Sequence, residues 1–335
     1  MMYVNRKAMY QELEQARNSK VLVYVTGDRP GLETRIASEV YDLFVNQLDK
    51  IGITNKISLY LYTRGGDTLA AWSIINLIKQ FADEIEVIVP SKCHSAGTLM
   101  ALGANNIIMT KQATLGPIDP SINDPLNPQI PGAAPDAKVP VSVEDIKGFI
   151  ELAVEECKMT GPEHLKDVMS ILSNNVHPLV LGRVFRAKSQ IQMLATKLIK
   201  EHIEDESIVE RIVKFLCSES GSHDYTIHRR EARNSLGMLV EKPDDVLYAK
   251  IKNIYDDIEN ELALTSRFEP NSFLGTDNQK TYGLKRCLLE SVEGGSHYYV
   301  SEGVIRRQQI QPQPGIVQQV INDNRSFEGW KYETP

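Results

Sequence analysis

Two short segments of the sequence combine residue types that could support hydrolysis by a nucleophilic serine. The first, LYTRGGD, ends an apolar run with Gly65 and Gly66. The second, PSKCHSAGT, places Ser95 between His94 and a run of small residues that begins at Ala96. A serine hydroxyl can form an acyl intermediate when a base activates it, and free backbone N–H groups can stabilise the oxyanion that develops. These segments are therefore candidates for a nucleophile and an oxyanion hole.

Each segment also has a purely structural interpretation. Two glycines followed by Asp67 are typical of a tight turn from a strand into a helix, with Asp67 as the helix N-cap. Ser95 could likewise only cap the next helix, because serine caps far outnumber nucleophiles. The segment also departs from the G-x-S-x-G elbow, since Cys93 stands at the first glycine position. The stronger signal is the pair, because Ser95 follows Gly66 by 29 residues, at the ends of successive predicted strands.

The pattern between residues 20 and 115 predicts an α/β fold whose mostly parallel sheet is flanked by helices. Apolar runs rich in β-branched and aromatic residues predict strands at 21–27, 56–66, 84–90 and 105–111, and helical periodicity predicts helices at 34–51 and 67–82. Alternating strands and helices form parallel sheets through right-handed crossovers. Ligands of such sheets bind at the carboxyl ends of the strands, where both segments lie.

The rest of the chain predicts a loop followed by further helices. Residues 117–140 hold seven of the 16 prolines, so this segment is expected to be a lid or loop beside the site. Helices are expected at 142–159, 181–202, 206–217 and 244–264, and a strand at 296–305. We expect a catalytic domain of residues 1–217 and a helical or α+β extension of residues 218–335 that packs on the same domain.

Composition narrows the classes of function. A net charge of −7 argues against non-specific nucleic-acid binding. The sequence contains no apolar run long enough to span a bilayer and no signal-peptide core in its first ten residues, so a cytoplasmic protein is expected. The four cysteines form no CxxC pair, and neither a metal-binding histidine motif, a GxGxxG after the first strand nor a Walker A motif is present. We therefore expect no metal and no cofactor.

Three segments together resemble a known group of enzymes. LYLYTRGGD, VIVPSKCHSAGTLMALGANNIIMT and ATLGPIDPSI follow one another with the spacing of the Clp/crotonase superfamily. They are most similar to the serine dehydrogenase proteinase family, relatives of signal peptide peptidase A. The resemblance covers about residues 15–125 and extends loosely through residues 222–232 and 290–303. One departure is Arg64, which stands where these proteins usually have proline before the two glycines.

The resemblance implies roles for individual residues and for the assembly. Ser95 corresponds to the acyl-forming nucleophile, and Gly66 and Ala96 correspond to the residues whose N–H groups form the oxyanion hole. A polypeptide substrate and a homo-oligomer are implied as well. The sequence indicates neither the number of subunits nor an ATPase partner.

The residue that would activate Ser95 is less obvious. Clp proteases use a histidine soon after the serine, but this chain has no histidine between His94 and His164. Signal peptide peptidases use a lysine further along, and Lys138, which follows Ser95 by 43 residues in the proline-rich segment, matches that pattern. The resemblance therefore favours a Ser95–Lys138 dyad over a histidine triad, provided that burial lowers the pKa of the lysine.

Other candidates stay open. His94 is adjacent to the serine but is expected to point in another direction. His223, in SHDYTIHRREA, is the second candidate base, although that segment also suits a helix entry. Asp119, in GPIDP, could orient a base or cap a turn, and Lys147 is expected to be solvated on a helix.

The sequence therefore predicts a cytosolic serine peptidase that acts through an acyl-enzyme. Two alternatives remain. One is an enzyme of crotonase type that acts on thioesters or other acyl groups and uses the same two N–H groups without the serine. The other is an inactive scaffold of the same fold.

Overall fold

The computed structural model describes residues 3–134, 136–313 and 316–334. The chain forms two compact units: a sheet unit of Met1–Thr114 with Leu239–Pro335, and a helical unit of Leu115–Met238. The division into two compact units does not show which residues form the catalytic domain. The expected domain boundary at residue 217 therefore stays a prediction.

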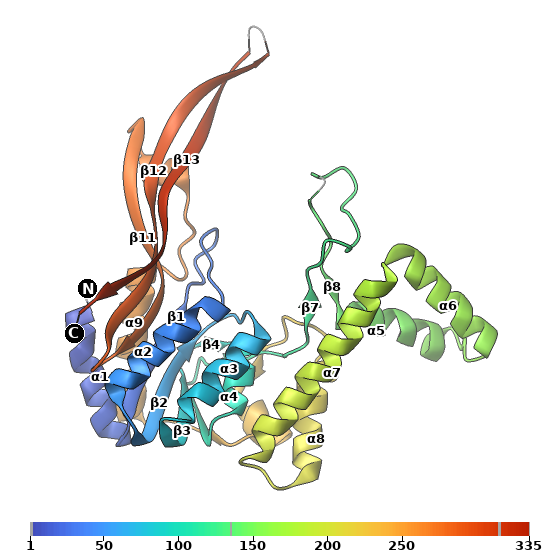
Figure 1. The fold of residues 1–335 in the computed structure, drawn as a ribbon, viewed down its shortest axis with the longest axis horizontal. Coiled ribbons are helices and arrows are strands. Elements are labelled where there is room, and N and C mark those ends of the chain that lie inside the picture. Colours follow the sequence, from blue (N-terminus) through green and yellow to red (C-terminus); the bar gives the residue numbers. More distant parts are fainter. Residues whose placement is uncertain (1–2, 135, 314–315, 335) are drawn as a thin grey trace. The chain divides into compact units, whose positions relative to one another are not determined.

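The sheet unit is built on one large sheet (Figure 1). Within the described residues the sheet has eight strands in the order β10-β5-β3-β2-β1-β11-β12-β13. Their bounds are β1 Lys20–Thr26, β2 Thr54–Tyr62, β3 Ala82–Val89, β5 Asn106–Met109, β10 Val240–Glu241, β11 Gln279–Ser291, β12 Gly295–Gln313 and β13 Ile316–Glu333. The first five strands in the sheet order run parallel, and β11, β12 and β13 continue the sheet antiparallel. The predicted α/β class with a mostly parallel sheet is confirmed.

Both faces of the parallel strands are covered by helices. The helices of the sheet unit are α1 Tyr3–Arg17, α2 Tyr41–Ile51, α3 Thr68–Ile78, α4 Ala96–Leu102, α9 Asp245–Leu262 and α10 Pro270–Leu274. Val23 belongs to the apolar cluster that contains Tyr10 of α1 and Ile254 of α9, whereas the next residue, Tyr24, meets Phe44 of α2 edge to face. Side chains of a strand alternate between faces, so burial on both faces explains the unbroken apolar run of β1.

The N-terminal helix α1 was not predicted, because its sequence is strongly polar. It is held by Arg6, which is fully buried and pairs with Glu290 of β11 at 2.8 Å and with Asp257 of α9 at 2.9 Å. Glu261 also pairs with this guanidinium. Buried charges are tolerated only when they are paired in this way. A long-range ion cluster thus anchors this helix, together with Tyr3, Tyr10 and Leu13, which belong to the apolar cluster.

The helical unit carries α5 Val143–Glu151, α6 Pro162–Asn175, α7 Pro178–Lys200 and α8 Glu206–Lys214. Short π-helical turns extend α5 and α8, at Leu152–Glu156 and Phe215–Glu219, and a third lies at Glu231–Leu236. β7 Ser121–Ile122 pairs antiparallel with β8 Val141–Ser142, so the proline-rich segment is a loop closed by two short strands. Its expected role as a lid stays a prediction. The remaining short strands are β4 Lys92–Cys93, β6 Thr114–Leu115 and β9 Ile227–His228.

A search of the described residues for a helix both long and apolar enough to cross a bilayer finds none.

Candidate active site

The Gly65–Gly66 turn follows the carboxyl end of β2 and is held by backbone and hydroxyl hydrogen bonds. The Gly65 N–H donates to Thr63 Oγ1 at 2.9 Å, and the Thr26 hydroxyl donates to the same oxygen at 2.8 Å. Ile36 N–H donates to the Gly65 carbonyl at 2.9 Å. The turn is therefore fixed by both neighbouring threonines and by the segment around Ile36.

Gly66 has a backbone that only glycine fits. Its φ is +149°, and a Cβ atom there would lie 2.3 Å from the carbonyl oxygen of Ile36. Ile36 pairs with this turn through the Gly65 carbonyl and through the Asp67 N–H, which donates to the Ile36 carbonyl at 2.8 Å. This pairing does not use the Gly66 N–H. Within the described part of the chain, neither this N–H nor that of Ala96 has a hydrogen-bond partner. Two backbone donors are thus available to an anion.

Ser95 occupies a strained turn rather than an ordinary helix cap. Its φ of 51° and ψ of −119° match the first central position of a type II′ turn, which glycine usually takes, and Gly97 N–H closes the turn on the His94 carbonyl at 2.9 Å. Its side chain makes no capping hydrogen bond to α4. Such a conformation costs on the order of 1–3 kcal/mol and is concentrated at functional sites. The Ser95 hydroxyl therefore does not cap α4.

The turn and the serine pack directly against each other. A Cβ atom on Gly65, whose φ is +107°, would lie 2.7 Å from Ser95 Cβ and 3.2 Å from its Oγ. On the other side, a Cβ atom on Gly97 would lie 2.3 Å from Cγ2 of Thr63. The two segments singled out in the sequence are therefore in contact, and two glycines make that contact possible.

The residues that precede Ser95 are occupied elsewhere. The His94 imidazole lies 2.9 Å, Nε2 to Oγ1, from Thr114. Cys93 is fully buried, and this burial raises the pKa of its thiol far above the ordinary value. A protonated, inaccessible thiol is a poor nucleophile. Ser95 is the candidate nucleophile of this segment.

In the helical unit, Asp119 and His223 form a polar pair. Asp119 Oδ1 lies 3.0 Å from His223 Nδ1. The carboxylate is fully buried, and among the described residues its Oδ2 has no hydrogen-bond partner, whereas 45% of the His223 side chain is exposed. The hydrogen bond to Asp119 raises the pKa of His223 against the opposing effect of burial. A buried carboxylate that orients a half-exposed imidazole is the arrangement of a general acid–base.

The two candidate lysines of the helical unit differ in their surroundings. Lys138 lies in the proline-rich segment, where its backbone pairs with Gln129, and its side chain is half-buried. Within the described residues its ammonium has no hydrogen bond or ion pair. Lys147, expected to be solvated, instead donates to the Ser218 carbonyl at 2.5 Å and pairs with Glu151 at 3.4 Å. Lys147 therefore acts as a structural link within its unit.

The predicted site residues divide between the two units. The sheet unit contains Gly65, Gly66, His94, Ser95 and Ala96, and the helical unit contains Asp119, Lys138 and His223. The sheet unit alone brings together the candidate nucleophile Ser95 and the candidate oxyanion donors Gly66 and Ala96. The hydroxyl of Thr63 was missed in the sequence, because a threonine in a strand carries no local sign that it will hold a turn.

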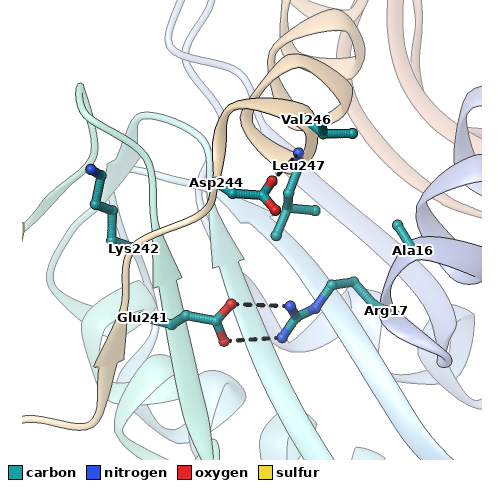
Figure 2. Close-up of a pocket in the computed structure, with 7 residues that line it drawn as sticks. All are labelled: Ala16, Arg17, Glu241, Lys242, Asp244, Val246 and Leu247. Carbon is teal, nitrogen blue, oxygen red and sulfur yellow. Dashed lines mark hydrogen bonds and ion pairs between the residues drawn. The ribbon is translucent and has the colours of Figure 1, made fainter.

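A separate pocket of the sheet unit lies between the end of α1 and the start of α9 (Figure 2). Its volume is about 370 Å³. Arg17 crosses it to Glu241 with two hydrogen bonds of 3.0 and 3.1 Å and also binds Glu86. The Arg17 guanidinium is thus already paired with two carboxylates and is not free to bind a substrate.

Comparison with known proteins finds similarity between part of the chain and a protease family. Residues 1–156 match the family described as ClpP-like SDH-type serine proteinase, which confirms the predicted resemblance over that range and supports a serine peptidase. An uncharacterized protein of Methanocaldococcus jannaschii is 30% identical over 192 residues, or 57% of this chain and 56% of the relative. The match thus spans little more than half the length of that relative.

Two solved structures are also similar to this chain, at lower sequence identity. The membrane-bound stomatin-specific protease 1510-N is 18% identical, with a TM-score of 0.37, over 70% of this chain and 86% of the protease. ClpP1 of Listeria monocytogenes is 15% identical, with a TM-score of 0.35, over 70% of this chain and 99% of ClpP1.

Proposed function

We propose that the protein is a serine peptidase in which Ser95 is the nucleophile and the N–H groups of Gly66 and Ala96 form the oxyanion hole. One observation carries the proposal: a strained serine that caps nothing packs against a glycine turn with an unused N–H. The family match of residues 1–156 supports the same reaction class.

The reaction follows from these groups. Ser95 Oγ attacks the carbonyl carbon of the scissile peptide bond while a base takes the hydroxyl proton. The carbonyl oxygen becomes an oxyanion, which the two backbone N–H groups stabilise. The C–N bond then breaks, the protonated base gives its proton to the departing amine, and the substrate remains as an ester on Ser95. Water, deprotonated by the same base, attacks the ester and releases the acid.

Two residues compete for the role of the base. The resemblance implies Lys138, which needs a lowered pKa to be neutral near pH 7. His223 needs no such shift, because an imidazole titrates near neutrality and Asp119 orients it. Lys138 stays the base that we propose from the resemblance, and His223, which Asp119 orients within the helical unit, is the second candidate.

The nucleophile is tested with a fluorophosphonate probe, which reacts with activated serines. We expect the wild-type chain to be labelled and Ser95→Ala to lose all labelling. Ser73→Ala is the matched control, because Ser73 is an exposed serine of α3 in the same unit. Undiminished labelling of Ser95→Ala would reject the proposal. Turnover of an acyl thioester that is insensitive to Ser95→Ala would instead support the crotonase-type alternative, and no reaction of either kind would support the scaffold.

The base is tested with single substitutions. We expect Lys138→Ala to lower the labelling rate by at least about 10²-fold, as removal of a general base does. His223→Ala should leave the labelling rate close to that of the wild type. A large loss in His223→Ala that added imidazole partly restores, with little change in Lys138→Ala, would assign the base to His223.

The assembly and the location belong to the same proposal. The resemblance implies a polypeptide substrate and a homo-oligomer, and the hydropathy pattern of the sequence is the basis for proposing a cytoplasmic location. Apolar side chains that stay exposed on the helical unit, among them Met169 of α6 and Phe185 of α7, are compatible with contacts between copies. Sedimentation analysis of the purified chain measures the oligomeric state.

A further inference from the structure

Three polar side chains of the sheet unit meet at the carboxylate of Asp28, in the loop that follows β1. Lys92 Nζ lies 2.5 Å from Asp28 Oδ2, and Arg64 Nη1 lies 3.4 Å from Asp28 Oδ1. The Tyr62 hydroxyl donates to Oδ2 at 3.0 Å. We call these four residues the Asp28 cluster. It combines two cations with one carboxylate, so one positive charge is left over within it.

The cluster is built from the same two segments as the candidate active site. Arg64 directly precedes Gly65 in the turn. Lys92 lies three residues before Ser95, and its carbonyl accepts a hydrogen bond of 3.0 Å from Thr63 N–H. The two cations therefore flank the Gly65–Gly66 turn and the strand that leads into the nucleophile.

Burial differs sharply between the carboxylate and the two cations. The Asp28 side chain is 5% exposed, whereas Lys92 is 42% exposed and Arg64 is 56% exposed. Arg64 makes one long contact to Asp28, and within the described residues its other donors have no partner. The buried Asp28 carboxylate thus holds two solvent-exposed cations in place. Both cations keep N–H donors that can bind an anion.

Nearby carboxylates are already bound to other groups. Asp67, two residues after Gly65, accepts the Ala70 N–H at 2.8 Å as the cap of α3. Glu259, whose negative charge helps to raise the pKa of Tyr62, accepts a hydrogen bond from the Thr265 hydroxyl at 2.9 Å. Among the described residues, neither of these two carboxylates forms an ion pair with Arg64 or Lys92, whose ion pairs are with Asp28.

We propose that Arg64 and Lys92 bind a carboxylate of the substrate and so select peptides that carry one close to the scissile bond. This inference rests on the proposed peptidase function. A guanidinium presents planar pairs of N–H donors that match a carboxylate, and an ammonium adds a point charge. Asp28 is the positioning residue, since it sets the cations and does not itself meet the substrate. The carboxylate comes from an acidic side chain or from the C-terminus of the peptide.

The test compares matched substrates on the full chain. Fluorogenic peptides that differ only by Glu or Gln beside the scissile bond report an acidic side chain, and the same peptides with a free or amidated C-terminus report a terminal carboxylate. We expect the wild type to cleave the peptide that carries the recognised carboxylate, either the Glu side chain or the free C-terminus, with a kcat/KM about tenfold higher than that of its neutral counterpart. One charge-assisted contact would give a ratio of this size. Arg64→Gln and Lys92→Gln should each reduce the preference, and the double variant should abolish it, so that the two members of each peptide pair are cleaved with the same kcat/KM.

Controls separate selection from general loss of charge or fold. Arg267→Gln removes an exposed cation of the same unit that pairs only with Glu269 among the described residues, and it should leave the preference unchanged. Asp28→Asn should lower the preference as well, because it releases the two cations.

Peptidyl phosphonate probes with and without a carboxylate repeat the comparison without turnover. Labelling of Ser95 with no preference in wild type, or a preference that survives the double variant, would overturn the inference and leave the peptidase proposal standing. Absence of any labelling of Ser95 would overturn both.

Discussion

Gly65 and Ser95 lie so close that no side chain fits between them. A Cβ atom on Gly65 would be 2.7 Å from the Cβ of Ser95, well inside van der Waals contact. The two residues are 30 positions apart in the chain and follow different strands. Their contact places the free N–H of Gly66 close to the serine whose attack on a carbonyl group would create an oxyanion.

Gly65→Ala should abolish probe labelling of Ser95. The new methyl group would displace the serine, and the backbone φ of +107° would add strain of about 1–2 kcal/mol. The matched control is Gly31→Ala, because Gly31 has a φ of +89° but a Cβ atom there meets nothing within 4 Å. The control should lose about 1 kcal/mol in the free energy of unfolding and keep its labelling. Equal labelling in the two variants would contradict the contact.

Ser95→Gly should be more stable than Ser95→Ala. Glycine adopts the φ of 51° and ψ of −119° without strain, whereas alanine keeps the strain and lacks the hydroxyl. We expect the free energy of unfolding of Ser95→Gly to exceed that of Ser95→Ala by about 1 kcal/mol, with both variants inactive. Urea unfolding measures the difference, and a more stable Ser95→Ala would show that the turn is not strained.

Gly97→Ala should be rescued by a second substitution across the contact. Its Cβ atom would lie 2.3 Å from Cγ2 of Thr63, so the single variant should lose about 1–3 kcal/mol of stability by overpacking. Thr63→Ser removes that methyl group and keeps the hydroxyl that holds the Gly65–Gly66 turn. The double variant should regain most of the stability and labelling. Additive losses in a double-mutant cycle would argue against a direct contact.

The stability of the helical unit should depend on pH through His223. The pKa of His223 is raised in the folded chain, chiefly by the hydrogen bond to Asp119. Its contribution to stability is therefore fully present below the unfolded pKa of about 6.5 and is lost as the pH rises through the higher folded pKa. The difference in unfolding free energy between wild type and His223→Gln should be larger at about pH 5.5 than at about pH 9.

An NMR titration isolates the same effect. The imidazole of His223 should titrate above about pH 6.5 in wild type and at a lower pH in Asp119→Asn, because the variant removes the negative partner. His297 of the sheet unit, whose Nδ1 lies 3.0 Å from Gln47 Nε2, serves as the internal reference whose titration should not move. An unchanged titration of His223 in Asp119→Asn would reject the pair.

The central strands and the two segments of the site follow from local patterns in the sequence. Buried parallel strands need unbroken apolar runs, and these are visible at β1, β2 and β3. The glycines before Asp67 and the serine before Ala96 are equally local signals, because tight turns restrict residue type. Ser95, Gly66 and Ala96 can therefore be proposed from the sequence alone.

Contacts between distant residues depend on the tertiary fold, which local patterns do not encode. Asp119 meets His223 across 104 residues and Lys92 meets Asp28 across 64, and a charged residue in a loop carries no sign of its distant partner. The polar α1 is ordered by Arg6 through carboxylates of α9 and β11, again across most of the chain. The strain of Ser95 is likewise invisible in the sequence, since serine is common at helix starts. Periodicity reports which face of an element is buried, but only the fold selects the partners that a charge or a strained turn meets.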